Sequence, residues 1–449
     1  MTVLAHAARS VESAEPLGLT GRVASVAGLV VHAESLPAPV GALVGIGDGP
    51  GAPALGEVIG FTRRATTIMP LHAIEGVRAG TRVRLLERAP SCRVGDGAIG
   101  RVLNALGEPI DAKGPVRWDG TRALNAPPTP ALGRVRITKP LETGVRAIDS
   151  LVTIGLGQRV GIFAGPGVGK STLLGQLARA SSADVNIIAL IGERGREVPD
   201  FLHGALGEAG LARSVVIVAT GDETPVMRVR AALTACALSE HFRDAGRNVL
   251  LTMDSVTRFA HAQRQIGLSL GEPPATRGYT PSVFARMSQL LERAGIVRTA
   301  SGVGSITALY TVLVEGDDMS EPVSDAARGI LDGHITLSRK IAQRGHFPAI
   351  DPLDSVSRVA DDVSAAEHAG DRRALVRMLS AYASAEELLQ IGAYAKGSNP
   401  DADTAIQRID AIRAFLFQGR GERTPMPETL KTLRALVAQG KSQPARATR

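Results

Sequence analysis

One stretch decides the fold that this sequence predicts: Ala164, Gly165, Pro166, Gly167, Val168, Gly169, Lys170, Ser171 and Thr172. The apolar run at 160–163 before it is typical of a buried strand, and apolar residues recur at helical spacing over 173–178. A glycine-rich loop between a strand and a helix binds nucleotide phosphates, because its backbone N–H groups and the helix N-terminus face the anion. Ala164 replaces the usual first glycine with another small residue. The context therefore predicts a nucleoside triphosphate site rather than an ordinary glycine-rich turn.

Two side chains of this loop suit a bound nucleotide. Lys170 can reach the β- and γ-phosphates, and the Ser171 hydroxyl can ligate Mg²⁺. We therefore expect ATP as the substrate, with Mg²⁺ as the cofactor that accompanies it.

The length and composition fit a globular protein of several domains. The chain has 449 residues, of which 44% are hydrophobic, enough for about three domains with buried cores. No apolar run approaches the roughly 18 residues of a membrane-spanning helix, and the N-terminus lacks the pattern of a signal peptide. We expect a cytoplasmic protein. Cys92 and Cys236 lie far apart in the sequence and are expected to be unpaired.

The net charge of +7 raises the question of an anionic partner, either nucleic acid or an acidic membrane surface. Between residues 1 and 117 the only aromatic residue is Phe61, whereas a barrel that binds single strands usually offers several rings for base stacking. Nucleic acid is therefore not the expected partner. A solvated basic surface is the simplest alternative.

Four regions differ in sequence pattern. Residues 1–18 are an alanine-rich tail or a short amphipathic helix. Residues 19–93 carry short apolar runs broken by Gly and Pro, which are typical of a small β-barrel. Residues 94–364 begin with a Gly- and Pro-rich connector (95–130) and then alternate strands and helices, while residues 365–449 are helical until a disordered end from 439.

The expected elements are placed as follows. Strands are predicted at 22–31, 41–46, 56–61 and 81–86 in the barrel, and at 160–164, 185–191, 215–219, 249–253 and 306–314 in the middle region. Helices are predicted at 225–244, 256–266, 281–293, 375–382, 385–394, 403–417 and 427–437. The predicted fold is an α/β phosphate-loop core with a mostly parallel sheet, an N-terminal β-barrel and a C-terminal helical domain.

Three further residues can complete an ATP-hydrolysing site. Asp254 ends an apolar strand, where it can either hold the Mg²⁺ shell opposite Ser171 or cap the helix that follows. Glu193 also ends an apolar strand and can either polarise an attacking water or lie in an exposed charged loop. Arg358 follows a turn, as an arginine finger can, but this sequence is rich in arginine.

Several longer strings resemble the family that joins the catalytic subunits of rotary ATP synthases to the ATPases of type III export. They are residues 253–260 (MDSVTRFA), 271–282 (GEPPATRGYTPS), 315–319 (EGDDM) and 331–335 (LDGHI). The string at 391–398 (IGAYAKGS) looks more like the flagellar branch than the virulence-secretion branch. The resemblance covers about residues 20–440 and implies a RecA-like core.

The resemblance also implies roles for individual residues. Glu193 falls on the family's catalytic carboxylate, Arg194 on a neighbouring phosphate-sensing arginine, and Arg258 lies near the γ-phosphate. Arg358 falls on the arginine that a neighbouring subunit supplies.

Two aromatic residues are implied at the adenine. Phe347 occupies the position of the ring that stacks on the base, where many relatives have tyrosine. Phe415 is expected to close the other side of the adenine pocket.

The implied assembly is a homohexamer, because Glu193 and Arg358 lie in one chain and a ring of identical subunits can complete every site. The resemblance implies an ATPase of flagellar type III protein export at the inner face of the cell membrane, acting on export chaperones, substrates and gate proteins. A stator-like regulator, and an acidic membrane surface, are expected to contact the N-terminus. A virulence-secretion ATPase and a ring-shaped ATPase that acts on RNA or DNA are the alternatives.

Overall fold

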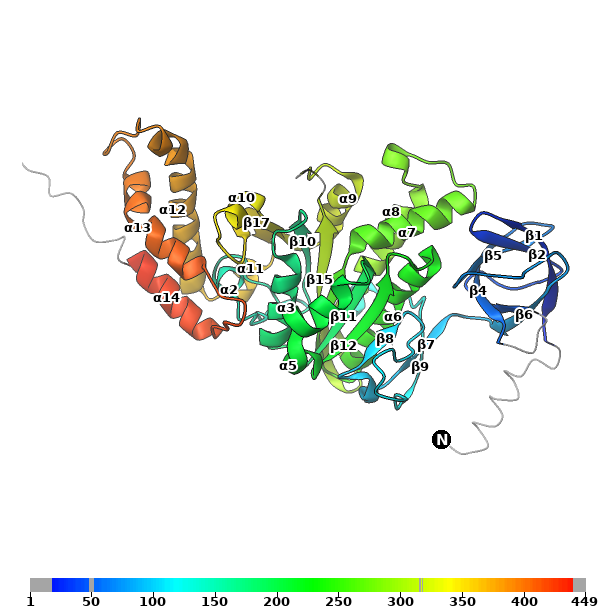
Figure 1. Cartoon of the computed structure of the whole chain (residues 1–449). Coiled ribbons are helices and arrows are strands. Elements are labelled where there is room, and N and C mark those ends of the chain that lie inside the picture. The colour runs from blue at the N-terminus through cyan, green and yellow to red at the C-terminus, as the bar shows by residue number, and fades with distance from the viewer. Residues whose placement is uncertain (1–17, 48–51, 315, 317, 439–449) are drawn as a thin grey trace, which may run out of the picture.

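The computed structural model describes residues 18–47, 52–314, 316 and 318–438. The three parts of the chain follow one another along the long axis of the molecule, with the barrel at one end, the sheet in the middle and the C-terminal helices at the other (Figure 1). The expectations for the tail at 1–17 and for the end at 439–449 lie outside the described residues.

The N-terminal part is a closed barrel with the strand order β1-β2-β5-β4-β3-β6, and closure leaves no unpaired strand edge. Its strands are β1 (Thr20–Ala27), β2 (Val30–Glu34), β3 (Leu43–Ile46), β4 (Ala54–Phe61), β5 (Thr66–Pro70) and β6 (Arg82–Glu87). The run predicted as a single strand at 22–31 is two strands, because Gly28 takes a positive φ of 57° and reverses the chain. Alternate residues such as Val31, Val58 and Ile68 fill the interior.

The barrel ends with β6, before the boundary expected at residue 93. The next strand, β7 (Ser91–Val94), pairs with β9 (Gly120–Ala123) instead. The stretch at 95–130 also contains β8 (Val102–Asn104), which extends the central sheet beside β12. This stretch is therefore part of the core rather than a plain connector.

The central sheet has the order β17-β16-β10-β15-β13-β11-β12-β8, with β14 paired to β15. Its main strands are β10 (Arg159–Ala164), β11 (Val185–Glu193), β12 (Ser214–Thr220), β13 (Asn248–Asp254) and β15 (Gly302–Leu313). All neighbouring pairs from β8 to β16 along this order are parallel. The mostly parallel sheet is confirmed, and each of these five strands was predicted. The strands β14 (Gly295–Thr299), β16 (Gly333–Leu337) and β17 (Ile350–Ser357) were not predicted.

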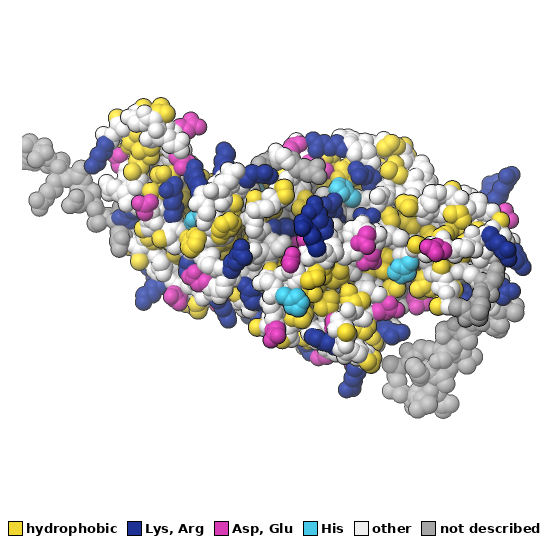
Figure 2. Space-filling view, in the orientation of Figure 1, with side chains coloured by type: hydrophobic (Ala, Val, Ile, Leu, Met, Phe, Trp, Pro, Cys, Tyr) yellow, Lys and Arg dark blue, Asp and Glu magenta, His cyan; other side chains and the backbone are white. Residues whose placement is uncertain are grey.

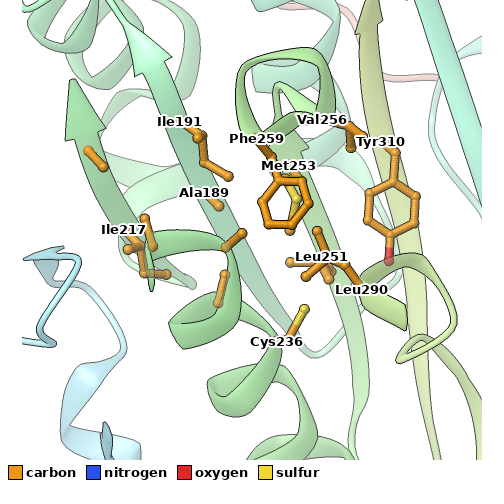
Figure 3. Packing of buried hydrophobic residues seen from close by; sticks show 14 of the residues in the cluster. Ala189, Ile191, Ile217, Cys236, Leu251, Met253, Val256, Phe259, Leu290 and Tyr310 are labelled. Atoms are coloured by element: carbon orange, nitrogen blue, oxygen red, sulfur yellow. The ribbon is translucent and has the colours of Figure 1, made fainter. Parts of the chain in front are cut away.

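Both faces of the sheet are covered, which explains why its strands read as continuous apolar runs. Ile187, Ala189 and Ile191 of β11 pack with α6 (Pro225–Asp244), α7 (Val256–Ser269) and α8 (Pro281–Leu291), whereas Ile188 and Leu190 pack with α3 (Lys170–Ala180) on the other face. Figure 3 shows Ala189, Ile191, Leu251 and Met253 pointing from neighbouring strands toward Phe259 and Cys236. Cys92 and Cys236 are both free and buried.

The C-terminal part consists of α12 (Ala366–Gln390), α13 (Pro400–Leu416) and α14 (Met426–Ala438). The two helices predicted at 375–382 and 385–394 are one, because nothing between them breaks a helix, and the break comes at Gly392 with a φ of 70°. The shorter helical segments are α2 (Arg146–Leu151), α4 (Glu197–Pro199), a π-helical turn (Asp200–Leu206), α5 (Gly207–Leu211), α9 (Pro322–Ile330), α10 (Arg339–Gln343) and α11 (Ala360–Val363). Among the described helices, none combines the length and apolar character needed to cross a membrane.

A buried ion pair ties α6 to the end of α8. Arg293 donates to both carboxylate oxygens of Glu240, at 2.7 and 2.9 Å, and to the backbone oxygen of Leu124 at 2.7 Å. The two charged side chains are 3% and 4% exposed.

Replacement of Arg293 should therefore leave the buried Glu240 carboxylate with only the partly exposed Arg122 as its charged partner. We predict that Arg293→Ala lowers the free energy of unfolding by about 3–5 kcal/mol, measured by urea denaturation. Arg136→Ala is the control, because Arg136 pairs with Asp362 on the surface and the loss should be about 0–1 kcal/mol. Equal losses in the two variants would contradict this account of the core.

Candidate active site

The phosphate-binding loop lies where the sequence places it, between the end of β10 at Ala164 and the start of α3 at Lys170. Gly167 and Gly169 have φ values of 77° and 90°, in the left-handed region that favours glycine. Val168 is buried and anchors the loop between them. The helix N-terminus and the loop N–H groups thus meet at one edge of the sheet, as an anion site requires.

Three charged side chains meet at this edge because parallel strands end there together. Lys170 Nζ contacts Asp254 Oδ1 at the end of β13 and lies 3.4 Å from Glu193 Oε1 at the end of β11. The hydroxyl of Thr311 on β15 donates to Asp254 Oδ1 at 2.7 Å. The sequence left open whether Asp254 caps the helix that follows it. Ser255 caps α7 instead, because its hydroxyl accepts from the backbone N–H of Arg258.

Burial and charge tune these groups. Burial, reinforced by the negative charge of Asp254 and opposed by Lys170, raises the pKa of Glu193 to about 7. Burial alone would lower the pKa of Lys170, but Asp254 and Glu193 outweigh it, so that this pKa is raised and the amine stays charged. A carboxyl group whose pKa lies near neutrality can take a proton from water at physiological pH.

The oxygen donors at this edge suit Mg²⁺. The exposed hydroxyl of Ser171 in the first turn of α3 and the carboxylates of Asp254 and Glu193 are hard ligands of the kind that Mg²⁺ prefers. The lysine between the carboxylates shows that their environment favours a cation.

A cavity of about 330 Å³ adjoins the loop, and two aromatic side chains line it. The ring of Phe347 lies against the loop, so that a Cβ on Gly169 would lie 3.4 Å from it. The cavity is lined by Gly167, Gly169, Thr172, Leu173, Gln176, Phe347, Pro348, Phe417, Gln418, Gly419 and Arg420. Flat apolar walls next to a phosphate site suit a stacked base.

The aromatic residue expected opposite Phe347 was Phe415, but Phe417 lines the cavity. Phe415 is 6% exposed and packs in the core with Ile412 and Leu416. Phe415 keeps the helical spacing of α13, which directs it inward, whereas Phe417 comes after the helix has ended and is free to face the cavity. Phe417 is only two residues from Phe415 in the sequence, and no periodic pattern indicates which of the two faces the cavity.

Two further arginines lie near this edge in different environments. Arg194 is exposed and pairs with Glu197 at 3.6 Å. The side chain of Arg258 packs against Gly192, next to Glu193, where a Cβ on the glycine would come within 2.8 Å of its Cβ. Its Nε is buried without a hydrogen-bond partner among the described residues, so it can still receive an acceptor.

Arg358 lies at the opposite edge of the sheet from the phosphate-binding loop. At the loop edge, Leu337 at the end of β16 pairs with Ala164 and Ile350. At the start of β16, Gly333 pairs with Ser357. The two ends of this strand lie about 13 Å apart, at roughly 3.3 Å per residue. The backbone N–H of Arg358 donates to the Asp332 oxygen at 3.0 Å, beside the start of β10. Within one chain, Arg358 therefore cannot join Lys170 and Glu193.

Comparisons with known proteins agree with this geometry. Residues 144–357 match the family model of the ATP synthase alpha/beta family, nucleotide-binding domain, and residues 364–435 match the T3SS EscN ATPase C-terminal domain. The chain is 48% identical over 440 residues to a flagellum-specific ATP synthase of Treponema pallidum, covering 97% of both proteins. It is also 48% identical over 381 residues, 85% of each, to a type 3 secretion system ATPase of Xanthomonas euvesicatoria.

The chain belongs to this family. It is an ATP-hydrolysing enzyme with the fold of the export ATPases. A solved structure of the assembled ATPase EscN from the type III secretion system of enteropathogenic E. coli superimposes with a TM-score of 0.85 at 40% identity, covering 93% of this chain and all of that one. A second structure shows EscN in complex with its central stalk EscO, with the same score.

One polar residue of the site was missed by the sequence reasoning. Thr311 lies within an apolar strand, and a threonine there is ordinary for a strand. Only the pairing of β15 beside β13 shows that its hydroxyl orients Asp254.

The two phenylalanines near the end of α13 should behave differently. We predict that Phe417→Ala raises the Kd for ATP about tenfold or more, as expected for a lost stacking partner, and leaves the unfolding midpoint nearly unchanged. Phe415→Ala should instead cost about 3–5 kcal/mol of folding stability. Titration calorimetry and urea denaturation of both variants measure these effects. A reversal of the two patterns would contradict the assignment of the cavity wall.

Proposed function

We propose that this chain is the ATP-hydrolysing motor of the flagellar type III protein export apparatus, coupling ATP hydrolysis to the handling of export substrates and chaperones and to activation of the export gate. The observation that carries hydrolysis is the convergence of Lys170, Glu193 and Asp254 at the phosphate-binding loop. Near full-length similarity to flagellum-specific ATP synthases, also of Bacillus subtilis at 46% identity over 93% of the chain, supports the export role.

Each residue at the loop edge has a distinct part in hydrolysis. Lys170 would exchange its carboxylate partners for the β- and γ-phosphate oxygens, and Glu193 would then be free to take a proton from the attacking water. Ser171 and Asp254 would hold Mg²⁺, which when bound neutralises charge on the phosphates. Arg258, whose Nε has no partner among the described residues, would face the γ-phosphate, and the exposed Arg194 would sense it.

The active unit is proposed to be a homohexamer. Arg358 lies at the far edge of the sheet from its own loop, so it can serve as an arginine finger only for the loop of a neighbouring copy. Because Glu193 and Arg358 belong to one chain, a closed ring of identical copies completes every site. The structure described as assembled EscN supports this arrangement.

Partners are proposed at the surface of the ring. The complex of EscN with its central stalk EscO supports a stalk-like or stator-like regulator, whose expected contact on the N-terminus lies outside the described residues. Export gate proteins, chaperones and substrates are the further partners of the proposed role. Figure 2 shows basic side chains over the barrel, the core and the C-terminal helices, interspersed with acidic ones, and this surface would permit peripheral contact with acidic lipid at the inner face of the membrane.

The pH dependence of hydrolysis tests the role of Glu193. Only the ionised carboxylate can accept a proton, so we predict that kcat/KM falls about tenfold for each pH unit below about 7. Glu193→Gln should bind ATP and Mg²⁺ yet release phosphate at least roughly a hundredfold more slowly.

Glu197→Gln is the matched control, because Glu197 raises the pKa of Glu193 without being the base. This variant should retain turnover, and the inflection in its profile of kcat/KM against pH should move to lower pH. Unchanged turnover in Glu193→Gln would show that another group activates the water.

Mixing two inactive variants tests the shared site. Arg358→Ala should bind ATP nearly normally but lose roughly 10³–10⁵ in rate, as expected for a missing arginine finger. Lys170→Ala should lose nucleotide binding and turnover.

Their mixture should recover part of the activity, because some interfaces then join an intact loop to an intact Arg358. A phosphate-release assay on mixed rings, with each variant alone as control, measures the recovery. Absence of recovery in rings that demonstrably contain both variants would refute the shared site.

A further inference from the structure

One wall of the base cavity is not part of a helix or strand. Residues 417–425, here called the linking segment, join α13 to α14 and place Phe417, Gln418, Gly419 and Arg420 at the cavity. A segment without secondary structure of its own needs outside contacts to hold a binding wall in place. One arginine makes several of these contacts.

Arg146, the first residue of α2, binds the end of α13 and the linking segment through every nitrogen of its side chain. Its Nε donates to the Phe415 oxygen at 2.7 Å, and its two terminal nitrogens donate to the Phe417 oxygen, the Glu422 carboxylate and, at 3.1 Å, the Thr424 hydroxyl. The planar guanidinium fixes these acceptors relative to one another, which a lysine amine cannot do.

Gln418 connects the two segments of the chain that carry the aromatic side chains of the cavity. Its backbone N–H donates to the backbone oxygen of Phe347 at 2.8 Å. This bond connects the linking segment directly to the residues that precede β17, which include Phe347. The side-chain amide of Gln418 accepts from the backbone N–H of Arg146 at 2.9 Å and donates to the Gly144 oxygen at 2.8 Å. Gln418 is almost fully buried, and the turn at 144–146 occupies both ends of its amide.

The linking segment is also held to the helix that begins at the phosphate-binding loop. Gln176 of α3 donates to the Glu422 oxygen at 2.9 Å, and Arg179 donates to the Arg420 oxygen at 2.6 Å. The wall that carries Phe417 therefore keeps a fixed position relative to Lys170. A base and its phosphates can then be held at one spacing.

We propose that Arg146 is a positioning residue for the nucleotide base: it holds the linking segment so that Phe417 lines the same cavity as Phe347. Arg146 is not among the residues that line the cavity, so it acts through the segment and not on the ligand. The inference rests on the ATP site described above. It goes beyond that site because it assigns affinity for the base to a residue outside the loop and outside the cavity.

The test compares a ligand that has a base with one that has none. ATP and inorganic tripolyphosphate share the phosphate chain, but only ATP has a base that can enter the cavity lined by Phe347 and Phe417. We expect Arg146→Gln to raise the Kd and the KM for ATP at least about tenfold, since several charge-assisted hydrogen bonds are lost. The Kd for tripolyphosphate and the kcat at saturating ATP should stay within about threefold of wild type.

Two further variants make the result specific. Arg146→Lys keeps the charge near Glu422 but cannot donate to the Phe415 and Phe417 oxygens together, so its Kd for ATP should fall between those of wild type and Arg146→Gln. Arg434→Gln is the matched control, because Arg434 joins α14 to α12 through Glu367 and Asp371 and does not line the cavity. Its Kd for both ligands should equal that of wild type.

Three results would overturn the proposal. An equal loss of ATP and tripolyphosphate binding would show that Arg146 supports the loop or the fold as a whole. Unchanged ATP binding in a folded Arg146→Gln would show that the segment holds itself. If Arg146→Gln does not fold, wild-type affinity in Arg146→Lys and in Glu422→Gln would refute the proposal in the same way. A wild-type protein that binds ATP but never hydrolyses it would instead refute the ATPase mechanism and leave the positioning role standing.

Discussion

The contact of Lys170 with Asp254 and Glu193 is the interaction on which the rest of the site depends. Two carboxylates held this close in a partly buried edge repel one another, and the repulsion contributes to the raised pKa of Glu193. A cation must therefore stand between them, and Lys170 does so in this structure. The same demand for positive charge suits Mg²⁺, while release of the lysine provides a charge for the phosphates. Binding and catalysis thus use the same three side chains.

The parallel sheet explains both what one chain can assemble and what it cannot. Because β10, β11, β13 and β15 all end at one edge, the parallel sheet itself brings the loop, both carboxylates and Thr311 together. The antiparallel return of β17 carries Arg358 to the other edge. One chain therefore holds the phosphate-binding half of one site and the arginine that would complete another. Assembly into a ring is then a requirement of the catalytic chemistry that we propose.

Much of the core could be predicted from the sequence because its signals are local and periodic. The loop glycines, the apolar strands β10, β11, β12, β13 and β15, and the helix α6 follow from spacing alone. The resemblance to a known family added Phe347, whose ring lies at the cavity.

Some predictions failed because they depend on contacts distant in sequence, and others because they depend on where one helix or strand ends. Thr311 matters only because β15 lies beside β13, and β8 joins the sheet from a stretch that has the composition of a connector. Phe415 and Phe417 differ only in which of them precedes the end of α13. The turn at Gly28 divides one apolar run into two strands.

The central claim is that a single copy cannot complete its own site, and the concentration dependence of wild-type turnover tests it most directly. Specific activity and the distribution of molecular mass should be measured together on one dilution series with saturating ATP and Mg²⁺. The account predicts that activity per chain rises in proportion to the fraction of chains in closed rings and is very low where only monomers remain. Full activity in a purely monomeric sample would contradict it.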